Sequence, residues 1–297
     1  MESPHELRAV CQKGKESGPG WYFAHRRVSI YLTWALLHAR IAPNEISVLM
    51  MLVGTLGAAC LAVPAAALNI VGFPLLYLSF LLDKVDGEIA RYRGTVSMRG
   101  MMLDRVHHLM VEPLALIAAG GREYMLSGSL SPVIAALVAV LAGNLVDEHQ
   151  HLAPYIFFKH LKSGASRPAG GSRGSRRGLD VLAGVFRPLK AFRLFITVVP
   201  SLALAYTIQA LMGWPAVRWY LWVAAAGLGV MLVFQSLYYY ARKLQEEIAD
   251  LNHMVERRES AVDENLTAIR SAGSNAGDIV SAVDASTNQS ISKARVH

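Results

Sequence analysis

Long apolar runs separated by short polar segments are the main pattern along this chain of 297 residues. A membrane-spanning helix needs about 20 mostly apolar residues. We therefore predict an all-α, polytopic membrane protein with six transmembrane helices, preceded by an N-terminal interfacial amphipathic helix. The expected spans are residues 45–63, 68–91, 100–120, 129–146, 194–212 and 217–239.

The segment before the first expected span has a different pattern. Residues 21–41 interleave aromatic and aliphatic side chains with five basic ones: His25, Arg26, Arg27, His38 and Arg40. This pattern is typical of a helix that lies at the membrane surface, and an ordinary amphipathic packing helix is the alternative. Pro43, just before the first span, suits a helix N-terminus.

Composition agrees with the membrane prediction. The chain is 53% hydrophobic, with a mean hydropathy of +0.33, and its apolar residues come in runs. The N-terminus lacks an apolar core and a cleavage site, so we expect no cleaved signal peptide. The net charge of +7 is concentrated, which favours a topology signal and contact with anionic lipid or phosphate over nucleic acid. Cys11 and Cys60 lack the spacing of a metal site or disulfide framework.

The stretch 82–108 has acidic and small residues at helical spacing inside apolar surroundings. Asp83 and Asp86 are three residues apart, so on a helix both carboxylates leave the same face. Gly87 and Ala90 lie near that face and keep it open. We therefore expect two helices and the turn between them to build one polar pocket.

The next segment has a glycine and then three polar residues at every fourth position: Gly100, Asp104, His108 and Glu112. On a helix this spacing places an open backbone, a carboxylate, an imidazole and a second carboxylate on one face. Carboxylates that converge repel one another unless a cation lies between them, and hard divalent ions such as Mg2+ prefer carboxylate oxygens and often share substrate phosphates. The pattern therefore predicts a site for metal and phosphate. Four arginines add positive charge at its mouth, as a phosphorylated substrate requires: Arg91, Arg93, Arg99 and Arg105.

These residues resemble the motif of a known family. The pattern D-x2-D-G-x2-A-R-x8-G-x3-D-x3-D is typical of the CDP-alcohol phosphotransferases, also called CDP-alcohol phosphatidyltransferases. In register with it, this chain has Asp83, Asp86, Gly87, Ala90, Arg91, Gly100 and Asp104. His108 stands where the family has its last aspartate. Seven matches at fixed spacing are far more specific than a lone glycine motif.

The resemblance implies an integral membrane enzyme that moves a substituted phosphate group from a CDP-alcohol donor to an acceptor hydroxyl and releases CMP. The acceptor would be a lipid or a glycan, in phospholipid or in glycolipid and glycan biosynthesis, and the protein would be a homodimer. The ligands of two divalent ions, Mg2+ or Mn2+, would be Asp83, Asp86 and Asp104. The small residues that let the nucleotide approach the helix backbones would be Gly87, Ala90 and Gly100. Arg91 would contact phosphate or support the aspartates.

The substitution at position 108 changes the expected chemistry. Histidine has an unperturbed pKa of about 6.5, which suits a general base at neutral pH, but imidazole is a poorer ligand for Mg2+ than for Mn2+ or Zn2+. We therefore hypothesise that His108 is the base that deprotonates the acceptor, and that the second metal is weakly bound, absent or Mn2+. His107 is the alternative imidazole, although it points about 100° away on an ideal helix.

Glu112 lies one turn beyond His108, inside an expected span, where an ionisable residue is a functional candidate. Its carboxylate can accept the imidazole N–H and raise the basicity of the ring. The alternative is that Glu112 satisfies the backbone group freed by Pro113 or pairs with another span. The altered position 108 also favours an alternative function, a relative that binds CDP-alcohol or lipid without standard transfer. A transporter is disfavoured because the aspartates gather at one membrane edge.

The fourth expected span ends in polar residues. Asn144, Asp147 and His151 share a helix face, so they either contact acceptor or phosphate in the same pocket or form an interfacial cap in water. A site of two histidines and one carboxylate for a metal is the weaker interpretation. Residues 159–190 are a basic linker rich in Gly, Ser and Arg, with too little apolar content to fold alone.

The charge distribution predicts the topology. Six spans place both termini, the basic linker and the turn between the motif helices on one side, and these segments hold nearly all of the Lys and Arg. By the positive-inside rule, the termini and the active site face the cytoplasm, and the protein lies in the cell inner membrane.

Three regions follow from these patterns. Residues 1–42 form an N-terminal arm with the interfacial helix, 43–240 a six-helix transmembrane catalytic domain, and 241–297 a hydrophilic helix followed by a tail that is disordered from 271. The apolar seam of the last helix consists of Leu244, Ile248, Leu251 and Val255. This seam supports either a short dimeric coil or a solvated helix.

Overall fold

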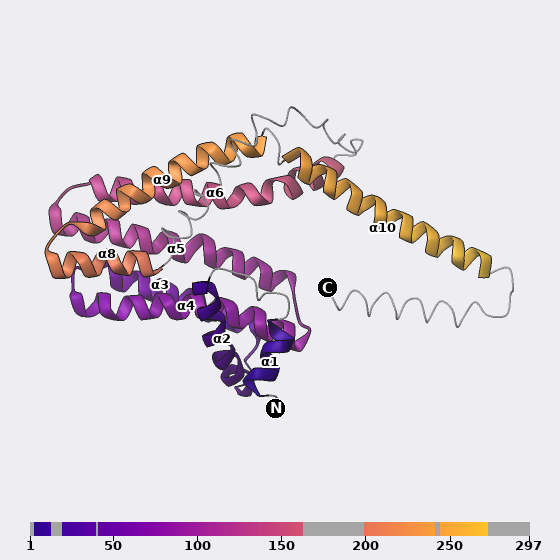
Figure 1. The fold of residues 1–297 in the computed structure, drawn as a ribbon, viewed down its shortest axis with the longest axis horizontal. Coiled ribbons are helices and arrows are strands. Elements are labelled where there is room, and N and C mark those ends of the chain that lie inside the picture. The colour runs from indigo at the N-terminus through magenta and orange to yellow at the C-terminus, as the bar shows by residue number, and fades with distance from the viewer. Residues whose placement is uncertain (1–2, 13–19, 40, 163–198, 241–243, 273–297) are drawn as a thin grey trace. The chain divides into compact units, whose positions relative to one another are not determined.

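The computed structural model describes residues 3–12, 20–39, 41–162, 199–240 and 244–272. Over these residues every regular element is a helix and none is a strand, which confirms the predicted all-α class (Figure 1). The chain divides into two compact units. The first consists of Met1–Val146 and Val185–Val233, and the second of Asp147–Gly184 and Phe234–His297.

Long helices of the first unit lie over the predicted spans, but two of them extend well past the predicted ends at 120 and 146, and the predicted start at 194 lies outside the described residues. These helices are α3 (Pro43–Ala62), α4 (Ala66–Arg93), α5 (Met98–Ser127), the first part of α6 (Ser131–Lys162), α8 (Val199–Met212) and most of α9 (Ala216–Tyr238). In Figure 1, α3 and α4 run alongside each other with α5 next to them. The motif residues lie on α4 and α5, so this pair of helices carries the expected pocket.

The ends of these helices follow from local sequence. Pro43 is the first residue of α3, and the Glu45 carboxylate accepts the backbone N–H of Ala42 at 2.9 Å. Gly94 ends α4 with a φ of 62°, a left-handed conformation that glycine adopts without strain. The Ser97 hydroxyl then caps α5 by accepting the N–H of Gly100 at 3.1 Å. The short turn between α4 and α5 is therefore encoded residue by residue.

Four described helical segments are long and apolar enough to cross a membrane: Pro43–Ala62, Ala66–Arg93, Ser131–His149 and Ala216–Tyr238. The expected third span, α5, is long but carries charged residues such as Asp104, Arg105 and Glu112, which lower its hydropathy. The expected fifth span is described only from Val199, as the 14-residue α8. The count of six spans therefore stays a prediction.

Small residues let α3 and α4 pack closely. A Cβ added at Gly57 would lie 2.9 Å from the backbone nitrogen of Leu76, and one added at Gly72 would lie 2.9 Å from the carbonyl oxygen of Gly57. Neither position has room for a larger residue, a common device where helices approach within a membrane. Buried alanines and leucines of α3, α4, α5, α6, α8 and α9 complete this core.

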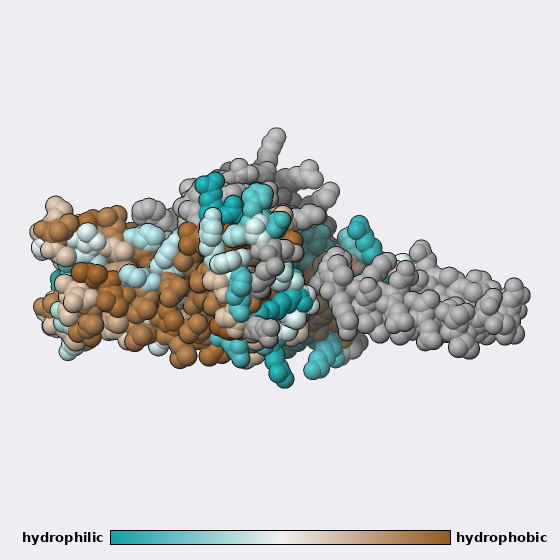
Figure 2. Space-filling view, turned by 90° about the horizontal axis from the view of Figure 1, so that it is seen from below, coloured by the Kyte–Doolittle hydropathy of each residue, from teal (hydrophilic) through white to brown (hydrophobic). Residues whose placement is uncertain are grey.

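Apolar side chains are exposed on the outer surface of α3 and α4. They include Val48, Leu49, Leu52, Leu56, Ile70 and Val71. Figure 2 shows hydrophobic residues gathered in a broad face over the first unit. Exposed apolar surface of this extent is unfavourable in water and favourable against lipid tails. The surface therefore agrees with an integral membrane protein.

Two N-terminal helices, α1 (Pro4–Cys11) and α2 (Gly20–His38), pack against α4 within the first unit. The helix predicted over 21–41 is thus present as α2, whereas α1 was not predicted. Its signal is a capping box, in which the Ser3 hydroxyl accepts the Glu6 N–H and the Glu6 carboxylate accepts the Ser3 N–H. Leu7 and Cys11 of α1 are buried in the resulting apolar cluster.

Glu88 of α4 ties these N-terminal helices to the membrane helices. Its carboxylate is fully buried and accepts hydrogen bonds from Gln12 at 2.8 Å, Ser29 at 2.8 Å and Thr33 at 2.6 Å. Three donors from two segments satisfy the buried carboxyl group, as burial requires. Glu88 therefore has a structural role that the sequence pattern did not reveal.

The second unit contains the end of α6, the end of α9 and α10 (Leu244–Ala272). The Tyr239 hydroxyl accepts the N–H of Ala153 at 3.0 Å and donates to Glu247 at 2.7 Å, so it links the segments of this unit. The predicted C-terminal helix is present as α10, and its dimeric coil stays a prediction. Most of the basic linker and the tail beyond 272 lie outside the described residues.

Candidate active site

A cavity of about 340 Å³ opens in the first unit beside α4 and α5. Its lining includes every position of the motif: Asp83, Asp86, Gly87, Ala90, Arg91, Gly100, Asp104 and His108. These residues are divided between two helices and separated by the α4–α5 turn. Helical spacing predicted that they would converge, and the structure brings all eight together.

Asp86 is a buried carboxylate that contacts α3. Its side chain is only 8% exposed and accepts a hydrogen bond from the Ser47 hydroxyl at 2.7 Å. Ser47 lies on α3, which was not part of the motif, and it also lines the cavity. The motif helices thus depend on α3 to orient one of their carboxylates.

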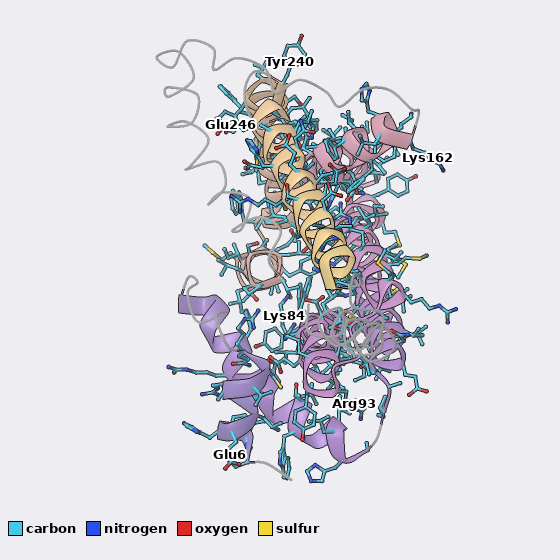
Figure 3. The ribbon with its side chains drawn as sticks, turned by 90° about the vertical axis from the view of Figure 1, so that its right-hand side faces the viewer. Glu6, Lys84, Arg93, Lys162, Tyr240 and Glu246 are labelled. Carbon is cyan, nitrogen blue, oxygen red and sulfur yellow. The ribbon has the colours of Figure 1, made fainter. Side chains whose placement is uncertain are left out.

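Asp83 is the centre of the charged groups in the cavity. It is buried and forms an ion pair with the neighbouring Lys84. His108 Nε2 lies 3.4 Å from Asp83 Oδ1 and 3.8 Å from Asp104 Oδ1. Figure 3 labels Lys84 among the side chains between the helices and Arg93 at the end of α4. The ammonium of Lys84 therefore already offsets part of the repulsion between the converging carboxylates.

Two glycines leave room beside the carboxylates. A Cβ at Gly87 would lie 3.1 Å from the Arg91 guanidinium, and one at Gly100 would lie 3.4 Å from Asn44 Oδ1 and Ser97 Oγ. Larger side chains at either position would enter the cavity. The backbones of both motif helices are therefore open to a ligand at these points.

The four arginines expected at the mouth occupy different environments. Arg91 lines the cavity, and its Nε donates to the carbonyl oxygen of Cys11 at 2.8 Å. Arg93 donates to the carbonyl oxygen of Ile41 at 2.7 Å and is not among the lining residues, and neither are Arg99 and Arg105. Arg26 of α2 does line the cavity, although no sequence argument selected it.

α2 also brings a histidine close to the charged groups. His25 Nδ1 lies 2.9 Å from the Tyr77 hydroxyl. Burial, together with the charge of Lys84, lowers the pKa of His25 below its usual value. The ring is therefore neutral at pH 7 and does not add positive charge beside the cavity.

A family model described as CDP-alcohol phosphatidyltransferase matches residues 40–230, more than half of the chain. The chain belongs to the CDP-alcohol phosphatidyltransferase family. The matched range contains both motif helices and the cavity that they line. The resemblance inferred from the motif is thus confirmed. Among curated proteins, no match to this chain is found.

Three solved structures of Mycobacterium tuberculosis phosphatidylinositol phosphate synthase are similar to this family member. The one with CDP-DAG bound is 17% identical, with a TM-score of 0.48, over 72% of this chain and 94% of that chain. The complex with manganese and citrate is 16% identical, with a TM-score of 0.46, over 71% and 88%. The apo form is 18% identical, with a TM-score of 0.43, over 70% and 94%.

Three other candidate residues of this family member lie away from the described cavity lining. Glu112 is partly buried one turn beyond His108 on α5, and Asn144 lies on α6. Neither is among the residues that line the cavity. Asp147 belongs to the second unit. The roles expected for these three residues stay predictions.

The cavity of this CDP-alcohol phosphatidyltransferase relative also contains residues that the motif does not include. Lys84 lies between the two motif aspartates on α4, Ser47 and Asn44 come from α3, and Arg26 comes from α2. Ser47, Asn44 and Arg26 come near the motif only because α2 and α3 pack against α4. Lys84 had a local signal, because it stands between Asp83 and Asp86, whereas the others had none.

Donor groups on α4 and α5, two of which line the cavity, fit a divalent ion. Asp83, His107 and His108 each offer one ligand atom, and these atoms lie within 4.8 Å of one another. Asp86 and Asp104 add carboxylate oxygens along the same cavity. Carboxylate oxygen suits Mg2+ and Mn2+, and imidazole nitrogen suits Mn2+ and Zn2+. The residues are therefore suitable for the metal that the family motif implies.

Proposed function

We propose that this chain is an integral membrane phosphotransferase that moves a substituted phosphate group from a CDP-alcohol to an acceptor hydroxyl and releases CMP. The observation that carries the proposal is that all eight motif positions, from two helices, line one cavity. The reaction would serve phospholipid synthesis or the modification of a glycolipid or glycan. We further infer that the site faces the cytoplasm of the inner membrane and that the protein is a homodimer.

Asp83, Asp86 and Asp104 would hold the divalent ion, Mg2+ or Mn2+. Such an ion neutralises the pyrophosphate of the donor and the charge that develops on the departing CMP. Ser47 orients Asp86 by donating a hydrogen bond to its carboxylate. Gly87, Ala90 and Gly100 would leave space for the nucleotide against the helix backbones.

His108 would act as the general base. It lines the cavity, and Asp83 lies 3.4 Å from its Nε2. The ring takes the proton of the acceptor hydroxyl, the oxygen forms a bond to the phosphorus nearer the transferred group, and the bond from that phosphorus to the CMP oxygen breaks. The negative charge of Asp83 stabilises the imidazolium that forms. Glu112 would be a positioning residue one turn away.

Arg91 would contact the phosphates of the donor. Its Nε is held by the Cys11 carbonyl oxygen, which leaves the terminal nitrogens, beside Gly87, to face the cavity. A guanidinium can bind phosphate through two hydrogen bonds at once. The contacts expected from Arg93, Arg99, Arg105, Asn144 and Asp147 to the acceptor or to phosphate stay predictions outside this proposal, because none of the five lines the described cavity.

The direct test is CMP release by the purified protein in lipid bilayers, with a panel of CDP-alcohols and of lipid and glycan acceptors, in Mg2+ and in Mn2+. We expect release with at least one pair, and its loss in both Asp86→Asn and His108→Ala. If no CDP-alcohol binds and no CMP is released under any condition, the transferase proposal is wrong. Turnover that survives His108→Ala but not His107→Ala would instead make His107 the base.

A second candidate function is binding of a CDP-alcohol or lipid without standard transfer. The observation that favours it is His108 in place of the last aspartate of the motif. The same assay separates the two functions, because a binding-only protein would retain CDP-alcohol in an equilibrium binding measurement and would release no CMP with any acceptor.

A further inference from the structure

His107 lies outside the family motif, yet its ring is held in one tautomer. It is fully buried on α5, and its Nε2 lies 2.9 Å from the Ser79 hydroxyl oxygen. The Ser79 hydroxyl donates its single hydrogen to the Met50 carbonyl oxygen at 2.7 Å, so it has none left for the ring. Ser79 must therefore accept from Nε2–H. Because full burial favours the uncharged ring, Nδ1 carries a lone pair.

That lone pair faces a carboxylate. His107 Nδ1 is buried without a hydrogen-bond partner, and it lies 4.0 Å from Asp83 Oδ1. Two electron-rich atoms facing each other repel, and a buried acceptor left without a partner is costly. A cation between the two atoms would satisfy both at once.

A second imidazole completes the arrangement. His108 Nε2 lies 3.4 Å from the same Asp83 oxygen, and the ligand atoms of Asp83, His107 and His108 all lie within 4.8 Å of one another. Around an ion bound at about 2.0–2.2 Å, neighbouring ligand atoms lie roughly 3.3 Å apart. One of the separations already fits, and the others need only a modest inward movement of the side chains.

We propose that Asp83, His107 Nδ1 and His108 Nε2 form a nitrogen-rich metal site that takes Mn2+ or Zn2+ in preference to Mg2+. Imidazole nitrogen favours these borderline ions over Mg2+, which prefers oxygen ligands. The proposal deepens the proposed function and rests on it only in that the cavity takes a divalent ion. A nitrogen bound to the ion cannot accept a proton, so the ligand role of His108 Nε2 is an alternative to the role of His108 as the base.

Ser79 has the place of a supporting residue in such a site. A histidine that binds a metal through one nitrogen usually donates its other N–H to a fixed acceptor, which orients the ring. Ser79 is that acceptor. Gly54 leaves room for the Ser79 side chain, because a Cβ at Gly54 would lie 2.6 Å from the Ser79 hydroxyl oxygen. The contact chain from Met50 through Ser79 to His107 therefore aims Nδ1 at Asp83.

The test is pulsed electron paramagnetic resonance of Mn2+ bound to the full-length protein in nanodiscs, with histidines labelled by 15N and no nucleotide present. We expect couplings from two imidazole nitrogens in the natural sequence, and from one in His107→Leu. Mn2+ and Zn2+ should each bind more than about tenfold more weakly to His107→Leu, with Mg2+ affinity changed by less than about twofold. His38→Leu, at an exposed histidine of α2, is the matched control and should match the natural sequence.

Leucine is close to histidine in size and leaves no cavity, so we expect His107→Leu to fold. If it does not yield monodisperse protein, Ser79→Ala decides. This variant leaves the imidazole in place and removes the acceptor of Nε2–H, together with the hydrogen bond to the Met50 carbonyl oxygen, and it should weaken Mn2+ binding about tenfold. One imidazole nitrogen, or none, in the natural sequence would overturn the proposal, as would unchanged Mn2+ binding in both variants. Because no step uses a substrate, absence of CMP release would not affect this result.

Discussion

Two sets of carboxylates on α4 lie within two turns of each other but have opposite environments. Glu88 is fully buried, and its oxygens receive three hydrogen bonds from the N-terminal helices. Asp83 and Asp86 are almost as deeply buried, but they line a cavity and face Asp104 and His108. Glu88 receives all of its hydrogen bonds from the packed helices around it, whereas Asp83 and Asp86 have partners in Lys84 and Ser47 but also line a cavity.

The difference gives a criterion for separating structural from functional acids in a membrane helix. A buried carboxylate needs compensation, and hydroxyl and amide donors from neighbouring helices supply it at low cost when the role is to hold the fold. Carboxylates that lie beside one another repel, and this repulsion lowers the stability of the fold. Such a cluster, open to a cavity, indicates a site for a cation. Substitutions at the two places should therefore affect different properties.

The largest effect is expected from Asp86→Asn. Loss of one metal ligand should lower CMP release on the order of 10²–10³-fold. Thermal unfolding should change little, because the asparagine carbonyl oxygen can still accept the Ser47 hydroxyl. CMP release and the unfolding temperature are measured on the same reconstituted preparation. A variant that unfolds at a much lower temperature would contradict the distinction drawn from Glu88.

Glu88→Ala should instead weaken the fold. It removes the shared acceptor of Gln12, Ser29 and Thr33, of which only Gln12 and Ser29 can still donate to the Arg26 carbonyl oxygen. We expect this loss to cost about 3 kcal/mol of unfolding free energy. α1 and α2 should then become accessible to protease, as mass spectrometry of cleaved fragments would show. Glu88→Gln, which keeps one acceptor oxygen, should lose less. If Glu88→Ala were as stable as the natural sequence, this carboxylate would have no structural role.

Arg91→Lys tests whether the guanidinium of the cavity binds phosphate. Lysine cannot both reach the Cys11 carbonyl oxygen and present two parallel donors, so KM for the CDP-alcohol should rise about tenfold. Arg93→Lys is the matched control two residues away, and its KM should change less than about twofold, because Arg93 contacts the Ile41 carbonyl oxygen rather than the cavity. Equal effects of the two variants would refute the assignment.

His108→Asp restores the aspartate of the family motif. Replacing imidazole by carboxylate should shift the preference from Mn2+ toward Mg2+, and we expect the ratio of Mg2+ to Mn2+ affinity to rise about fivefold. Isothermal titration with each ion measures this ratio without substrate. An unchanged ratio would mean that position 108 does not contact the ion.

The smallest effect is expected from Asn144→Ala. Asn144 lies on α6 and does not line the described cavity, so kcat/KM should change by about twofold or less. Steady-state CMP release measures it. A loss as large as that of Asp86→Asn would indicate that α6 contributes to the site. Asn144 would then contact the acceptor, as helical spacing suggested.

Local patterns predicted much of this fold and of its site. Apolar runs located most of the long helices within a few residues, and Pro43, Gly94 and Ser97 explain where three helix ends fall. The spacing of the motif residues was sufficient to bring eight side chains to one cavity, because helical geometry relates residues on the same helix and the short turn joins the two helices. α1 was missed because its apolar face is short.

The sequence by itself determined the helices, their likeness to the family motif and the substitution at position 108, since each depends on residues that are close together in the chain. Only the tertiary structure decided which polar groups meet across helices. It paired Glu88 with α1 and α2, Ser47 with Asp86, and Ser79 with His107. These contacts depend on how helices distant in sequence rotate and pack, which no local spacing specifies.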